Sequence, residues 1–130
     1  MKAFVAADRG RIGVASAMLA AMLVAAPTPA IAADLARGEQ LFHTCAACHS
    51  VLGDGIGPDI TGIYGQPAAT RPGFNYSEAL KRRGLIWNEA NLRAFIHNPQ
   101  AFVPGTLMSF PGYDRMADID DVVAYLRTLK

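Results

Sequence analysis

The run Cys45-Ala46-Ala47-Cys48-His49 decides how the rest of this 130-residue chain must fold. Its two cysteines are the only ones in the sequence, and they stand three positions apart. A pair of cysteines in an exported protein usually forms a disulfide, but these two would close a ring too small to stabilise a fold. The pair therefore points to a chemical site rather than to a cross-link.

The spacing Cys-x-x-Cys-His is that of covalent haem attachment. Thiols at this spacing can add to the two vinyl groups on one side of the macrocycle, and the adjacent histidine then reaches the iron. A thioredoxin-like dithiol would need a βαβ pattern around it, which is missing here. A structural zinc site lacks two further cysteines, although His43 and His97 are available as ligands. The motif predicts one haem c, bound through Cys45 and Cys48, with His49 as an axial ligand.

Beyond residue 33, and apart from the cysteine motif, the second axial ligand has four candidates: Met108, Met116, His43 and His97. Met108 follows Pro104-Gly105 in a loop between two helices, where a thioether can turn inward without breaking a helical face. Met116 lies beside the start of the last helix, and His43 is too close to the first cysteine to cross to the other haem face. His97 is placed to act as a cation at a helix C-terminus. The residues alone favour Met108 and leave the others open.

The first part of the chain has the pattern of an export signal. A basic opening precedes an uncharged apolar run over residues 12–26, and Ala30-Ile31-Ala32 supplies the small-x-small motif that a signal peptidase reads. The apolar run is shorter than the roughly 20 residues that a membrane span needs. We therefore expect residues 1–32 to be a cleavable signal peptide, residues 33–130 to be the folded domain, and the mature protein to be periplasmic. A retained membrane anchor is the alternative.

Four helices are expected from apolar spacing and capping residues. They run from Asp34 to the cysteines, from Ser77 to Gly84, from Asn88 to Asn98, and from Asp118 as N-cap to the chain end. Between them lie stretches rich in glycine and proline, with no strand-like alternation over residues 62–73. Loops of that length are unusual in a compact domain unless something organises them. The sequence predicts an all-α fold whose long loops wrap around one covalent haem.

Taken together, these motifs and helices resemble the class I cytochrome c family, in particular mitochondrial cytochrome c and bacterial cytochrome c2. The matching runs occur in the family's order and cover nearly all of residues 34–130: Gly38–Phe42, Cys45–His49, Gly57-Pro58, Pro72–Tyr76, Gly84–Trp87, Asn98-Pro99 and Pro104–Met108. The resemblance implies the small cytochrome c fold. It also implies that Gly38 and Phe42 meet Val122 and Tyr125 where the first and last helices cross.

The resemblance assigns further roles at the haem. It implies that Met108 is the second axial ligand, and that the carbonyl of Pro58 accepts a hydrogen bond from the free ring N–H of His49. It further implies that Tyr76 and Trp87 donate hydrogen bonds to a haem propionate. Without the resemblance, each of these aromatic residues would be read as ordinary core.

Some departures from the family pattern concern charge. Gln66 stands where the family often has an arginine near the propionate, which predicts weaker charge neutralisation there. The lysines that ring the exposed haem edge in mitochondrial members are largely missing, and such positions are occupied by Thr44, Gln100, Ala101 and Leu107. Electrostatic steering toward an acidic partner should therefore be weak. We expect docking through an apolar patch, for which Leu107 and Val103 are candidates.

With both axial positions filled, the iron has no place for a substrate, so we expect a one-electron carrier and not an enzyme. Its partners would be an oxidase, a photosynthetic reaction centre or a dehydrogenase, and it would meet the membrane only through membrane-bound partners. We expect a monomer. Removal of the signal leaves a net charge near −1, and nothing in the sequence suggests nucleic acid binding, which usually needs a clustered basic patch. A ligand-binding haem protein, such as a peroxidase or gas sensor, and a thiol–disulfide oxidoreductase are the alternatives.

Overall fold

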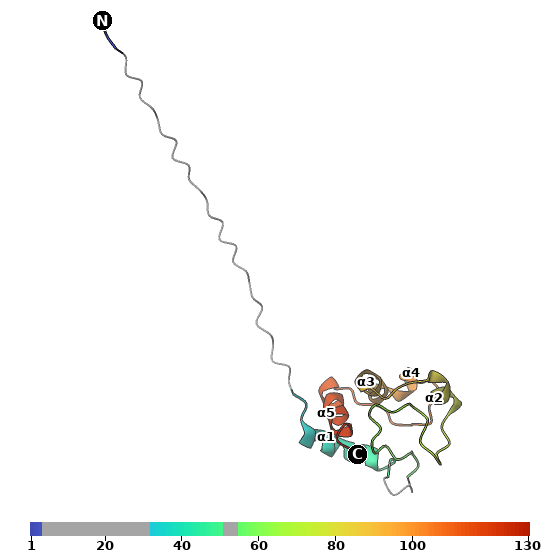
Figure 1. Cartoon of the computed structure of the whole chain (residues 1–130). Coiled ribbons are helices and arrows are strands. Elements are labelled where there is room, and N and C mark those ends of the chain that lie inside the picture. Colours follow the sequence, from blue (N-terminus) through green and yellow to red (C-terminus); the bar gives the residue numbers. More distant parts are fainter. Residues whose placement is uncertain (4–31, 51–54) are drawn as a thin grey trace. The chain divides into compact units, whose positions relative to one another are not determined.

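The computed structural model describes residues 1–3, 32–50 and 55–130. The chain divides into two units, Met1–Ala30 and Ile31–Lys130, and the helices found among the described residues belong to the second. They are α1 (Leu35–Ala46), α2 (Glu78–Arg83), α3 (Glu89–His97), α4 (Pro99–Phe102) and α5 (Met116–Leu126) (Figure 1). Pairing of β type is confined, in this part of the chain, to one isolated bridge between Pro67 and Ile86. The predicted all-α class is confirmed, whereas most of the predicted signal peptide lies outside the described residues.

Helix α1 delivers the cysteine motif to the interior of the domain. Its N-terminus is capped as predicted, because the Asp34 carboxylate accepts the backbone N–H of Arg37 at 3.1 Å. The helix ends one residue after Cys45. The backbone N–H groups of Cys48 and His49 then both donate to the Cys45 carbonyl, at 3.1 and 2.9 Å. This tight turn sets the second cysteine and the histidine directly beyond the helix end.

The predicted bounds of the last helix, from Asp118 to the chain end, are wrong, since α5 runs from Met116 to Leu126. Helix α5 begins at Met116, and its N-cap residue Arg115 makes no side-chain capping bond. Asp118 lies in the first turn instead, where its carboxylate pairs with the Arg37 guanidinium of α1 at 2.6 Å. A carboxylate in the first turn of a helix also interacts favourably with the helix dipole. Its partner on another helix is a tertiary contact that the local sequence pattern does not contain.

Helices α1 and α5 pack directly against each other. A Cβ atom added to Gly38 would lie 2.1 Å from the backbone oxygen of Asp121, so only glycine fits at the crossing. The rings of Phe42 and Tyr125 meet with their centroids 5.3 Å apart. The backbone N–H of Asp34 also donates to the Asp121 carboxylate at 2.7 Å. The implied contact between the first and last helices is thus present in the fold.

Helices α3 and α4 are joined through one residue. Asn98 ends α3, as predicted, and its side chain also caps α4 by accepting the N–H of Ala101 at 3.0 Å. Pro99 follows at the first position of α4, where its missing N–H costs nothing. Four residues are too few for a periodic pattern, which is why α4 was not expected from the sequence.

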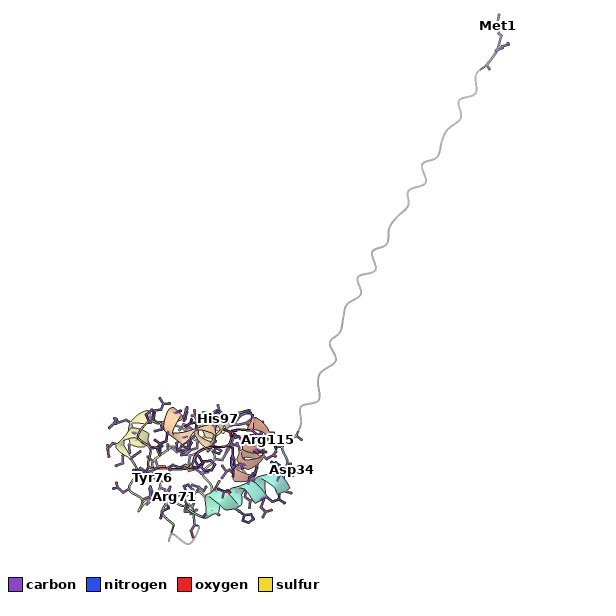
Figure 2. The ribbon with its side chains drawn as sticks, turned by 180° about the vertical axis from the view of Figure 1, so that it is seen from behind. Met1, Asp34, Arg71, Tyr76, His97 and Arg115 are labelled. Carbon is purple, nitrogen blue, oxygen red and sulfur yellow. The ribbon has the colours of Figure 1, made fainter. Side chains whose placement is uncertain are left out.

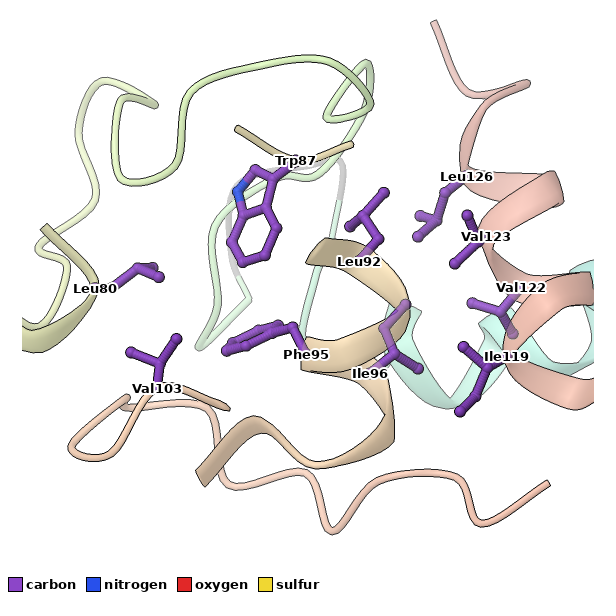
Figure 3. Packing of buried hydrophobic residues seen from close by; sticks show 10 residues of the cluster. All are labelled: Leu80, Trp87, Leu92, Phe95, Ile96, Val103, Ile119, Val122, Val123 and Leu126. Atoms are coloured by element: carbon purple, nitrogen blue, oxygen red, sulfur yellow. The ribbon is translucent and has the colours of Figure 1, made fainter. Parts of the chain in front are cut away.

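The hydrophobic core connects α3 to α5 (Figure 3). Leu92 and Ile96 of α3 lie toward Ile119 and Val122 of α5, and the last two are fully buried. Val103 is also fully buried, so its expected role in an exposed docking patch is wrong. None of the helices in the described part of the chain is long and apolar enough to cross a membrane.

The Gly38 crossing gives a direct test of the helix packing. Replacing Gly38 with alanine should lower the free energy of unfolding by about 3 kcal/mol, because the new methyl group collides with the backbone of α5. Glu39→Ala, at the exposed neighbouring position of α1, should change it by less than about 0.5 kcal/mol. Denaturant titration followed by circular dichroism measures both. A Gly38→Ala protein as stable as the wild type would contradict the close approach.

Candidate functional site

All seven residues predicted to serve the haem line one cavity of about 320 Å³. The thiols and His49 reach it from the end of α1 and the turn that follows, and Met108 reaches it from the loop before α5. Pro58, Tyr76 and Trp87 complete the predicted set. Most of the remaining lining is apolar, including Ile60, Leu80, Leu92, Phe95 and Ile96. None of the lining residues in the described part of the chain carries a charged Asp, Glu, Lys or Arg side chain.

The two thiols are free and half-buried. Burial raises the pKa of Cys45 to about 11, because the charged thiolate loses its hydration in this apolar setting. A reactive redox dithiol needs the opposite change, namely a lowered pKa that provides thiolate at neutral pH. The described residues also contain no cluster of three or more His, Cys, Asp or Glu side chains that could hold a metal ion. Neither the dithiol nor the zinc alternative is supported.

The imidazole of His49 is held from one side by backbone. Its Nδ1 lies 2.7 Å from the Pro58 carbonyl oxygen. Since a carbonyl can only accept, Nδ1 carries the proton and Nε2 keeps a lone pair for a metal. A Cβ atom on Gly57 would lie 2.8 Å from the imidazole Nδ1, so the backbone of this loop presses closely on the ring. The geometry is that of an oriented axial ligand.

Of the four candidates for the second ligand, Met108 alone lines the cavity. Met116 stands at the start of α5 with 43 % of its surface exposed. His43 is exposed on α1. His97 is exposed at the end of α3, where its Nδ1 donates to the Tyr113 carbonyl at 2.9 Å.

Trp87 and Tyr76, the two aromatic residues expected near a propionate, differ in their burial and in the ring that each contacts. Trp87 is buried, and its ring centroid is 5.0 Å from that of Phe95 (Figure 3). Tyr76 is half-buried, with its ring 4.8 Å from that of Phe74. Burial raises the pKa of the Tyr76 phenol, so the hydroxyl keeps its proton and stays a hydrogen-bond donor. Both positions are compatible with the predicted role, which stays a prediction.

Arg71 is a charged residue near the site that sequence reasoning missed. Its guanidinium donates to the Thr61 carbonyl and lies 3.9 Å from the Asp59 carboxylate. Arg71 and Tyr76 are labelled close together in Figure 2, and the charge of Arg71 acts on the Tyr76 phenol. Gln66, which the sequence singled out instead, is exposed. No local signal marks Arg71, because its hydrogen-bond and ion-pair partners, Thr61 and Asp59, lie ten or more residues away in the chain.

The donor set fits haem c. The cavity falls within the roughly 300–1,000 Å³ range of cofactor sites and is mainly apolar, as a porphyrin requires. It offers two thiols for covalent attachment, together with an imidazole and a thioether, which are the axial ligands found in cytochromes c.

Comparisons with known proteins agree with this site. The sequence model of the family described as Cytochrome c matches residues 35–130. Cytochrome c2 of Rhodomicrobium vannielii is 44 % identical over 86 % of this chain and 92 % of its own length. Cytochrome c-554 of Methylosinus trichosporium is 43 % identical over 82 % of this chain and 83 % of its own.

A solved structure extends the comparison from sequence to fold. Cytochrome cH from Methylobacterium extorquens is 42 % identical and superimposes with a TM-score of 0.70, over 73 % of this chain and 98 % of that one. The chain therefore belongs to the cytochrome c family. It is an electron carrier with one covalently attached haem c, and it is not an enzyme.

Proposed function

We propose that Cys45 and Cys48 attach the haem and that His49 and Met108 are its two axial ligands during electron transfer between redox proteins. The observation that carries this assignment is the convergence of all four side chains on one apolar cavity. Bound haem supplies a one-electron Fe(III)/Fe(II) couple. The chain's own residues supply attachment, orientation and exclusion of water.

Each axial ligand has a separate task in this proposal. The Pro58 carbonyl holds the Nδ1 proton of His49 at 2.7 Å, which fixes the tautomer and increases the basicity of the imidazole. The thioether of Met108 is a softer ligand, which favours the reduced state and raises the potential. With His49 and Met108 on the iron, no position would remain for a substrate. Tyr76 and Trp87 would donate hydrogen bonds to a haem propionate and hold it in the interior.

The assignment of Met108 as an axial ligand is tested by removing its thioether, which would leave that position on the iron open. Ferric Met108→Ala protein should bind cyanide at least about a hundredfold faster than the wild type, because no thioether has to leave first. It should also lose the far-red charge-transfer band that a thioether gives on ferric haem. Met116→Ala, at the exposed start of α5, is the matched control and should retain wild-type behaviour. Rapid cyanide binding by the wild type itself would favour the ligand-binding alternative.

We further propose that redox partners dock on an uncharged rim around the cavity mouth. Ile56 and Leu107 line the cavity and are nevertheless 82 % and 66 % exposed. The adjoining rim residues Thr44 and Ser109 are polar but carry no charge. Such a surface suits a partner whose docking face is itself largely apolar, whether an oxidase, a reaction centre or a dehydrogenase. The carrier acts as a monomer, with this rim available to one partner at a time.

Salt dependence tests the uncharged rim. The bimolecular rate of electron transfer to a membrane-bound partner should change less than about threefold between low and physiological ionic strength. Leu107→Glu should lower the rate about tenfold, since docking would bury a charge. Leu35→Glu makes the same change at an exposed leucine of α1 outside the cavity, and should have no effect. A steep fall in the wild-type rate with salt would refute docking through apolar contact.

We also propose that residues 1–32 are removed on export and that the mature protein works in the periplasm. The apolar run and the Ala30-Ile31-Ala32 motif support this proposal, and so does the start of helix α1 at Leu35, shortly after that motif. Mass spectrometry of protein from the periplasmic fraction should show an N-terminus at Ala33 or Asp34. An N-terminus within residues 1–26, or recovery only with membranes, would indicate the retained anchor.

A further inference from the structure

The side chain of Gln100 contacts the loop that carries Met108. Its Nε2 lies 3.1 Å from the Thr106 carbonyl oxygen and 3.0 Å from the Met108 carbonyl oxygen. Both partners can only accept, so the amide nitrogen and not the amide oxygen must face them. An amide group has two N–H bonds, one for each carbonyl. The contact therefore uses the full donor capacity of the side chain.

The helix that presents Gln100 is firmly anchored. Gln100 is the second residue of α4, whose first residue, Pro99, is fully buried. The Asn98 side chain caps the helix, and the Val103 N–H closes it by donating to the Pro99 carbonyl at 2.9 Å. The donor group thus stands on a fixed support, while its acceptors belong to a loop without regular secondary structure.

The loop over residues 103–108, called here the Met108 loop, needs such support. Its Thr106 is buried, its Leu107 is 66 % exposed, and Met108 lines the cavity. The Thr106 hydroxyl accepts the Met108 N–H at 3.3 Å. With the bond from Gln100 to the Met108 carbonyl, both backbone polar groups of Met108 have partners that hold its side chain toward the cavity.

We propose that Gln100 is a positioning residue that keeps the Met108 loop closed and so sets how often Met108 withdraws from the iron. The inference rests on the proposed ligation by Met108. Withdrawal of the loop breaks both bonds from Gln100. Because Gln100 is exposed, water can replace these bonds once the loop has opened, so each contributes modestly. Together they reduce the rate of withdrawal about tenfold.

The test measures the rate at which saturating cyanide binds to the ferric holoprotein, since cyanide must wait for the thioether to leave. Gln100→Leu removes both donors without adding charge. Gln100→Lys keeps N–H donors that can reach both carbonyls, and it serves as the rescue variant. Gln100→Glu has nearly the same shape but presents a carboxylate to two carbonyl oxygens. Gln40→Glu makes the same charge change at an exposed position of α1 and is its control.

The leucine and glutamate variants should bind cyanide about tenfold faster than the wild type, whereas the lysine variant and Gln40→Glu should stay within about twofold. When the pH is raised, the far-red thioether band should disappear at a lower pH in the leucine and glutamate variants than in the wild type. The midpoint of global unfolding should be nearly unchanged in all four, which separates loop closure from general stability.

Two results would overturn the inference: a leucine variant that binds cyanide at the wild-type rate, or a lysine variant as fast as the leucine one. A wild-type protein that lacks the far-red band and binds cyanide as fast as Met108→Ala would remove the premise as well. In that case the proposed ligation has failed, and not merely the role of Gln100.

Discussion

The apolar cavity at the centre of the domain is the constraint on which the rest of the structure depends. A dry void of 320 Å³ would cost a folded chain about 8 kcal/mol, and the whole stability of such a domain is only about 5–15 kcal/mol. Leaving such a space empty would therefore remove much of the stability of the folded chain. The haem c of the cytochrome c family meets this requirement, and it explains why long loops without regular structure can form a compact domain.

Two backbone contacts connect the helical frame to that cavity. At one end of α1, Gly38 lets the helix lie against α5. At the other end the helix stops one residue after Cys45, so the position of α1 on α5 also places the attachment site. The carbonyl of Pro58 then fixes the direction of the His49 imidazole. The loop that carries Met108 accepts two hydrogen bonds from Gln100 of α4. Electron transfer without ligand exchange would require both ligand-bearing segments to stay in place when the charge on the iron changes.

Much of this could be predicted from the sequence because the relevant signals are local. The spacing of Cys45 and Cys48, the caps at Asp34 and Asn88, and the stop at Asn98-Pro99 each involve residues a few positions apart. What the sequence did not reveal depends on contacts between distant segments. Asp118 resembles a helix cap but pairs with α1. The burial of Val103 and the donor role of Gln100 follow from how α4 packs, and α4 is too short to be recognised from periodicity.

The central claim, that Met108 faces the iron from inside the cavity, can be tested by NMR of the ferrous mature protein labelled with methyl-¹³C methionine. Removal of the first 32 residues leaves two methionines, Met108 and Met116, so the experiment contains its own reference. The account predicts one methyl resonance shifted far upfield by the haem ring current and assigned to Met108, and a second at the ordinary position of an exposed methionine. Two resonances at ordinary positions, or an upfield resonance that belongs to Met116, would contradict it.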